Sequence, residues 1–302
     1  MKTIRELFGK TLVLILIFAP LAWCGIVQGE DKVMLKLTAR PGDTYRNVLE
    51  MIESAVTKID GLSPGTTAPS TRNLMRMVIE TKVDGIEPSG DMDISCRATE
   101  LFTQAVNGTN IMNFASTDPA SRKAAESDPK LAAILDALNI TTHMVQEPTG
   151  DIKSVSFEGA KVDPFAQSTL EDNVIQPLII LPDHKVGVNE GWDAGSHSKV
   201  FASLGRMHMN YRCTLLSISS EKGEEVAKIG IKGTATLESD PESDTKNELE
   251  DFSMEGTQAL SLTRGRFIDG RADTAFTIKS TSPEATFRMR SRSTIHSWEI
   301  EK

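Results

Sequence analysis

The feature of this sequence that most constrains its fold is the alternation of apolar and polar residues along several long segments. A repeat of two residues is the spacing of a β-strand that buries one face. In 201–215, the residues that share one face are Phe201, Met207, Met209, Tyr211, Cys213 and Leu215. Alternation also runs through 74–83, 92–98, 224–237, 252–280 and 285–300. Long strands with one solvent-exposed face predict a large antiparallel sheet connected as a meander.

The middle of the chain departs from this pattern. Asp128-Pro129 is typical of a helix start, and four apolar residues then recur at helical spacing, namely Leu131, Ile134, Leu135 and Leu138. We therefore predict a helix over 129–139, a hairpin around 148–151 and a second short helix over 168–176. The predicted fold class is α+β, with a large antiparallel meander sheet and two short helices in the middle of the chain.

These segments divide the chain into a leader and one domain. Residues 1–29 are predicted to be a signal peptide, and 30–302 a single β-rich domain. Within this domain, the first strand set is expected at 33–107, beginning with a short strand at 33–37. A helical middle is expected at 118–182 and a second strand set at 198–300.

The leader has the order of a secretory signal, because Lys2, Arg5 and Lys10 precede an apolar run. Val27 and Gly29 are small enough for cleavage after Gly29, which predicts a periplasmic or secreted protein. One alternative is lipid anchoring at Cys24, although Trp23 stands where a lipoprotein signal needs a small residue. The other is an uncleaved anchor, since the uncharged stretch 11–29 is near the length that spans a bilayer.

The net charge of the chain limits the classes of partner that it can bind. The formal net charge is −9, and this balance argues against a protein that binds nucleic acid or adheres to an anionic membrane. We therefore expect no nucleic-acid partner. Membrane contact is expected only through the leader, if it is uncleaved, or through Cys24, if it is lipidated.

Cys96 and Cys213 remain after cleavage of the leader, and both are expected to point inward. In an exported protein such a pair is a candidate disulfide, and the alternative is two buried thiols that never meet. Neither cysteine belongs to a CxxC pair or lies near a histidine, so a redox or metal site is not indicated.

No motif for catalysis or for a cofactor stands out. The sequence has no GxSxG, GxGxxG or P-loop pattern, and its five histidines form no metal-binding spacing. The acidic stretch 240–251 has oxygen ligands at calcium-loop spacing, but Thr245 replaces the glycine and Asp251 the final glutamate. We therefore expect no enzyme activity, metal or cofactor.

The last strand carries a row of cations at Arg288, Arg290 and Arg292. This row is either the ordinary solvent-exposed face of a strand or a site for an anionic polymer or headgroup.

Methionines mark the predicted inner faces of the strands, at Met75, Met77, Met92, Met207, Met209, Met254 and Met289. They indicate either a plain core or a cavity for an apolar small molecule or lipid, because thioether side chains adapt to irregular ligands. The predicted function is that of an exported, non-enzymatic envelope protein, a binding or structural module that carries such a ligand. The alternative is a secreted hydrolase with an unrecognised site.

Two segments, 131–159 and 178–194, resemble the central stretch of a family of uncharacterised exported bacterial proteins, a domain of unknown function. The matching positions are Gly150, Ile152, Leu181, Pro182, Val186, Val188 and Trp192. The sequence departs from the family pattern at Asn189-Glu190, where Gly-Asp is usual. The resemblance implies export and a β-rich single domain, with no known activity. The order of elements is also similar to that of periplasmic lipoprotein carriers, whose curved sheet closes over an apolar cavity.

Overall fold

A computed structural model describes residues 32–60, 70–125, 127, 132, 135–136, 138–159, 179–201, 205–221, 223–240, 243–283 and 285–300. Residues from Val33 to Lys302 form one compact unit, separate from Met1–Lys32. The predicted signal peptide and its cleavage site lie outside the described residues. Within the described part of the chain, no helix is both long enough and apolar enough to cross a membrane.

One antiparallel sheet dominates the fold, and its strands are long because the alternation persists over many residues. The strands are β1 (Thr44–Ile59), β2 (Ser70–Ile86), β3 (Met92–Asn107), β4 (Asn110–Ala115), β5 (Thr141–Gln146), β6 (Ile152–Glu158), β7 (Gly191–Phe201), β8 (Gly205–Glu221), β9 (Glu224–Glu238), β10 (Lys246–Ser261), β11 (Arg266–Thr281) and β12 (Thr286–Ile300). Their order in the sheet is β6-β5-β3-β2-β1-β12-β11-β10-β9-β8-β7, and β4 pairs with β3. The expected meander is therefore present, and β1 joins β12 to close its two halves into one sheet.

The prediction of an α+β fold with two helices is wrong, because the described chain is nearly all β. Its one complete α-helix is α1 (Pro119–Ala125), which precedes the helix expected at 129–139. Asp118 caps α1 by accepting a hydrogen bond from the Ser121 N–H at 2.9 Å. The Asp-Pro pair that was expected to start a helix at 128–129 thus also occurs at 118–119, where it starts α1.

The two predicted helices fall mostly where the chain is not described. In 129–139, Ala132, Leu135 and Asp136 are helical and 138–139 form a turn, while 168–176 lies outside the described residues. Within the helical middle expected at 118–182, the predicted hairpin around 148–151 is confirmed, since β5 pairs with β6. The second half of the acidic stretch 240–251 lies in a strand, because β10 begins at Lys246.

The segment 33–43, here called the strap, replaces the predicted strand at 33–37. Only Val33 pairs in strand fashion, through an isolated bridge to Val186. Further along, the Leu37 N–H donates to the Pro148 carbonyl at 2.7 Å, and the Thr38 N–H donates to the Gly265 carbonyl at 2.8 Å. The strap therefore links the β5–β6 turn to the β10–β11 turn.

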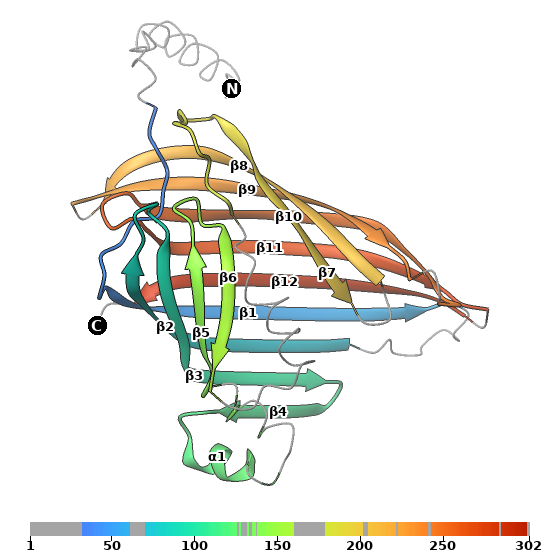
Figure 1. Ribbon diagram of the computed structural model, residues 1–302. Helices are drawn as coiled ribbons and strands as arrows, with labels where there is room; N and C mark the ends of the chain where they lie inside the picture. The colour runs from blue at the N-terminus through green and yellow to red at the C-terminus, as the bar shows by residue number, and fades with distance from the viewer. Residues whose placement is uncertain are drawn as a thin grey trace, which may run out of the picture. The chain divides into compact units, whose positions relative to one another are not determined.

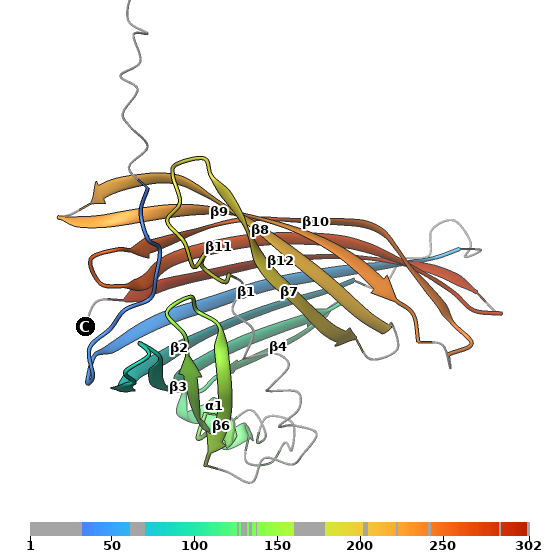
Figure 2. The ribbon, with the colours of Figure 1, turned by 45° about the horizontal axis from the view of Figure 1, so that its top comes forward.

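The main core lies where the sheet curves over itself. Residues from β3 and from β8 to β11 belong to one buried cluster, although several strands separate them in the sheet. Leu35 and Leu37 of the strap and Trp192 of β7 fill the space between them, and the Trp192 Nε1–H donates to the Ile180 carbonyl at 2.9 Å. Figures 1 and 2 show this curvature, with β7 and the β5–β6 hairpin crossing over one face of the long strands.

Candidate ligand cavity

A cavity of about 480 Å³ lies on the inner face of β1, β2 and β3, and is here called the apolar cavity. Most of its lining side chains are aliphatic or sulfur-containing. They are Leu49, Met75, Met77, Ile79, Cys96, Ala98, Leu101, Leu138, Ile140 and Met144, with Asn47, Thr81, Arg97, Thr142 and Ser297 completing the lining. None of these lining residues is a histidine, an aspartate or a glutamate.

The floor of the apolar cavity follows from the strand alternation and from one bulge. Met75 and Met77 project from β2, and each pairs with an apolar residue of β1 that points the same way. On β3, the register shifts around Thr99, since Ile79 pairs with Ala98 but Val78 pairs with Glu100. This extra residue turns both Ala98 and Leu101 toward the cavity.

The remaining wall comes from the segment that follows α1 and from β5. Leu138 and Ile140 precede β5, and Met144 lies on it. At the rim, the Arg97 Nε–H donates to the Leu138 carbonyl at 3.2 Å, which fixes this segment against β3. The cavity is thus lined by residues that are distant in sequence.

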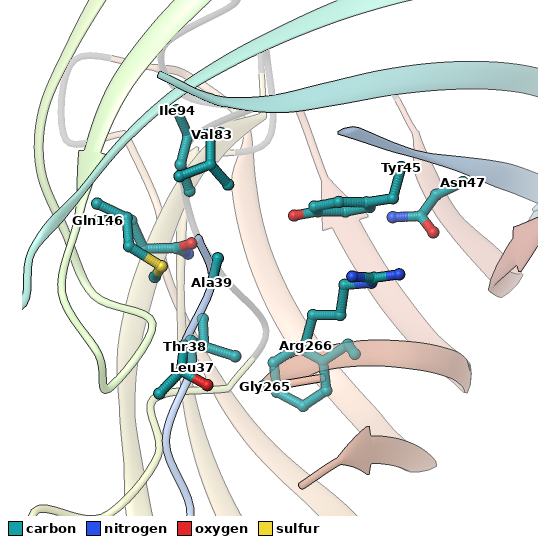
Figure 3. Close-up of a pocket in the computed structure, with 12 residues that line it drawn as sticks. Leu37, Thr38, Ala39, Tyr45, Asn47, Val83, Ile94, Gln146, Gly265 and Arg266 are labelled. Carbon is teal, nitrogen blue, oxygen red and sulfur yellow. The ribbon is translucent and has the colours of Figure 1, made fainter. Parts of the chain in front are cut away.

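A second, smaller cavity of about 180 Å³ adjoins the first, and Asn47 lines both. We call it the polar cavity. Figure 3 shows the Arg266 guanidinium beneath Tyr45 and Asn47, and the Tyr45 hydroxyl directed into the cavity. The guanidinium carbon lies 4.8 Å from the centre of the Tyr45 ring, within reach of a cation–π contact. Val83 and the strap residue Ala39 also line this space.

An ionic cluster of Arg264, Arg266 and Glu299 lies beside the polar cavity and holds Arg266 in place. Glu299 accepts hydrogen bonds from Arg266 Nη2 at 2.7 Å and from Arg264 Nη1 at 2.9 Å. The bond to Glu299 is the largest cause that raises the pKa of Arg266. Burial raises the pKa of Tyr45 to about 12, so its phenol stays protonated at neutral pH. Arg266 is therefore already neutralised by a protein carboxylate.

A chain of polar contacts connects the polar cavity with the apolar cavity. Thr81 bonds to Tyr45 and lies 3.5 Å from the Cys96 sulfur. Burial raises the pKa of Cys96, which keeps this thiol neutral. Among the hydrogen-bonding atoms of the described residues, the buried Asn47 Oδ1 has no partner. An uncharged acceptor thus stands at the boundary between the cavities.

The structure distributes the predicted ligand-cavity methionines over several places. Met75 and Met77 line the apolar cavity, and Met92 lines the polar cavity. Met207 and Met254 are buried, and Met209 packs against the main core cluster. Met289 is half-buried on β12 and lines neither cavity.

The candidate disulfide is absent from the structure, in which Cys96 and Cys213 are both free thiols. In the sheet, β3 and β8 are separated by β2, β1, β12, β11, β10 and β9. Cys96 lines the apolar cavity, whereas Cys213 is fully buried and its pKa is raised by burial to about 12. The two thiols therefore differ in surroundings and in expected reactivity.

Several residues that line the apolar cavity were not predicted from the sequence. Leu49 and Asn47 alternate on β1, and this pattern could have assigned them to the inner face. Leu101 could not be placed without the bulge at Thr99, and Met144 belongs to a hairpin whose packing partner was unknown.

Histidines and carboxylates meet elsewhere, at the surface. The exposed His143 Nε2 lies 3.0 Å from Glu158 Oε2, and His208 bonds both Ser198 and Glu238. Within the described chain, no three groups of the kind that hold a metal ion come together. The apolar cavity is therefore the best-formed candidate site.

No family model and no curated protein matches this chain. The family resemblance of 131–159 and 178–194 therefore stays a prediction. A structure concerned with lipid–protein interactions in lipovitellin is 9% identical with a TM-score of 0.45, and the similarity covers 87% of this chain and 25% of the lipovitellin chain. This chain thus spans about a quarter of that protein.

Two other solved structures are more weakly similar. DynF, from the dynemicin biosynthesis pathway of Micromonospora chersina, is 6% identical with a TM-score of 0.17, covering 88% of this chain and 89% of DynF. OpdQ of Pseudomonas aeruginosa is 9% identical with a TM-score of 0.18, covering 85% of this chain and 99% of OpdQ. TM-scores this low do not establish a shared fold.

Proposed function

We propose that this protein is an exported, non-enzymatic binding protein of the cell envelope that holds an apolar small molecule or lipid in the apolar cavity. The observation that carries the proposal is the cavity itself. Its volume of about 480 Å³ lies within the roughly 300–1,000 Å³ range of small-molecule sites. Its lining is mainly aliphatic and thioether, which favours a ligand without charge.

The energetic basis is burial of ligand surface. A ligand that buries roughly 200 Å² of apolar surface gains about 5 kcal/mol at about 25 cal/mol per Å². Part of this gain offsets the loss of translational and rotational freedom on binding. Met75, Met77 and Met144 have flexible unbranched side chains that can adjust to different ligand shapes.

The rival function, a hydrolase, needs an acid or base beside the bound substrate. The lining of the apolar cavity contains neither histidine nor carboxylate. The groove that includes His143, Asp84 and Asp93 has a different lining, and its histidine is bonded to the exposed Glu158. These observations favour binding over hydrolysis.

The experiment compares binding of the neutral fluorescent probe N-phenyl-1-naphthylamine to the wild type and to Ala98→Trp. An indole at position 98 occupies the cavity, so we expect the probe affinity to fall at least about tenfold, as when a pocket loses its apolar contacts. Ala124→Trp, on the exposed face of α1, is the matched control and should bind like the wild type. Equal affinity of all three proteins contradicts the proposal.

Circular dichroism accompanies these titrations, so that a variant that fails to fold is recognised. The wild type provides a second test that needs no substitution. Bound probe should be displaced by dodecanol, a long-chain alcohol of the expected apolar class. A wild type that binds neither compound also contradicts the proposal.

A further inference from the structure

The strand β1 finishes, and β12 begins, at the right-hand end of the sheet in Figure 1. Four cations gather at this end, on the outer face of the sheet, opposite the apolar cavity. They are Lys58, Arg72, Arg290 and Arg292, here called the basic patch, and all four are exposed. The alternation of β1, β2 and β12 fixes this face, since Leu49, Met77 and Ser297 point the other way into the apolar cavity.

The strand register places the four cations close together. Ser54 of β1 pairs with Arg72 on one side and with Arg292 on the other. Two residues further along β1, Val56 pairs with Arg290, and Lys58 follows. With strands about 4.8 Å apart and about 3.4 Å per residue, their Cα atoms fall within roughly 10 by 14 Å.

Carboxylates do not neutralise the basic patch. No member of the patch forms an ion pair with a carboxylate of the residues that the structure describes, since the acidic groups nearby have other partners. Arg288 bonds Asp60 and Glu250, and Lys279 lies 3.9 Å from Glu248.

Two other carboxylates lie near the patch in the register. Asp273 of β11 pairs with Thr294, two residues from Arg292, and it accepts hydrogen bonds from Thr294 and Arg271. Asp251 of β10 pairs with Thr277 of β11, and Thr277 in turn pairs with Arg290. Elsewhere on the outer face, cations have acidic partners, as Arg46 has Glu100 at 3.0 Å and Arg271 has Asp273 at 3.3 Å. The basic patch therefore differs from the ordinary mixed-charge surface of this sheet.

The patch also contains an exposed apolar side chain. Val56 lies among the cations and is 42% exposed. A chain of net charge −9 that gathers like charges around an exposed valine presents complementarity to an anionic partner. Apolar side chains enter the headgroup boundary of a bilayer, while arginines beside them reach the phosphates.

We propose that the basic patch docks this protein on membranes that contain anionic phospholipid. Nucleic-acid phosphates offer the same charge but nothing apolar for Val56 to enter at the backbone, so the observations favour the lipid surface. The inference does not depend on the apolar cavity. The net charge predicted no membrane contact by this route because it averages over the surface and does not show where cations gather.

The test maps the reaction of arginines with phenylglyoxal in the wild-type full chain, by peptide mass spectrometry. Vesicles of phosphatidylglycerol and phosphatidylcholine should slow modification of Arg72, Arg290 and Arg292, and added salt should restore it. Arg206 and Arg212, exposed on β8, serve as internal controls that keep their rates. Because each site is read separately, attachment through the leader does not mimic protection of the patch.

A variant measures the strength of docking. In Arg290→Gln/Arg292→Gln, the vesicle concentration that halves the modification rate of Arg72 should rise about 30-fold, roughly fivefold for each lost charge. Arg206→Gln/Arg212→Gln is the matched control and should behave like the wild type. Equal protection by pure phosphatidylcholine vesicles, protection of the β8 arginines, or protection by a DNA oligonucleotide but not by anionic vesicles overturns the proposal.

Discussion

Glu299 is the acceptor at the centre of the ionic cluster that supports the polar cavity, so Glu299→Gln tests how strongly this cluster stabilises the fold. Its carboxylate accepts two hydrogen bonds from Arg266, at 2.7 and 3.1 Å, and one from Arg264 at 2.9 Å. The Glu299 side chain is only 12% exposed, and those of Arg266 and Arg264 are 21% and 31% exposed. The substitution removes the negative charge but keeps the shape of the side chain.

The magnitude follows from this partial burial. Breaking a fully buried ion pair costs about 3–5 kcal/mol, and losing an exposed pair costs about 0.2–1 kcal/mol. Arg264 keeps a second carboxylate, Glu224 at 2.9 Å, which reduces the loss. We therefore expect Glu299→Gln to lower the free energy of unfolding by about 2 kcal/mol, or the Tm by roughly 5 °C.

Urea unfolding followed by tryptophan fluorescence measures this difference. Glu255→Gln is the matched control, because Glu255 lies 3.8 Å from Lys232 with both side chains largely exposed. The control should change the free energy of unfolding by less than about 0.5 kcal/mol. If Glu299→Gln costs no more than Glu255→Gln, the ionic cluster does not stabilise the fold.

Two further predictions concern the strap and the contact between the β2–β3 turn and β6. Gly265→Ala should destabilise the protein by more than Gly42→Ala in urea unfolding, because a Cβ at 265 overlaps Thr38 whereas one at 42 meets nothing within 4 Å. Both glycines have positive φ, so each alanine substitution costs about 1–2 kcal/mol of backbone strain. The additional loss in Gly265→Ala therefore measures the contact with the strap. Equal losses of unfolding free energy in the two variants contradict this contact. For Asp91, hydrogen bonds from Lys153 and Ser89 lower the carboxyl pKa, so its stabilisation is present above the unfolded value and is lost as pH falls through the folded pKa. The difference in unfolding free energy between the wild type and Asp91→Asn should therefore shrink below about pH 4, as measured by urea titrations across pH, and a difference that is constant with pH refutes the assignment.

The sequence predicted the strands well where one face is continuously buried. The inward face assigned to Met207, Tyr211, Cys213 and Leu215 is confirmed by their burial. Period-two alternation survives there because each residue meets the same core. The single sheet could not be foreseen in the same way, since the pairing of β1 with β12 joins residues from the two ends of the chain.

The fold class was wrong because local helix signals were given too much weight. An Asp-Pro pair caps α1 at Asp118, but α1 lasts only seven residues in a domain whose strands reach seventeen. The strap shows the opposite failure. Its apolar residues at 33–37 read as a strand, yet Leu35 and Leu37 are buried against the main core, and only Val33 makes a strand bridge.

The candidate site was only partly predictable for related reasons. Met75 and Met77 could be assigned to an inner face from alternation alone. Alternation cannot tell a filled core from a cavity, because the same apolar residues line both. The division between Met77 at the apolar cavity and Met207 in the packed core depends on curvature of the sheet, which no local pattern encodes.

Ligand protection of Cys96 in the wild-type chain tests the central claim most directly. Cys96 lines the apolar cavity, whereas Cys213 is fully buried in the main core and provides an internal control. We expect dodecanol to slow alkylation of Cys96 by N-ethylmaleimide at least about fivefold, with Cys213 unreactive throughout, as peptide mass spectrometry resolves each cysteine. An alkylation rate at Cys96 that is unchanged by saturating dodecanol would contradict ligand binding in the apolar cavity.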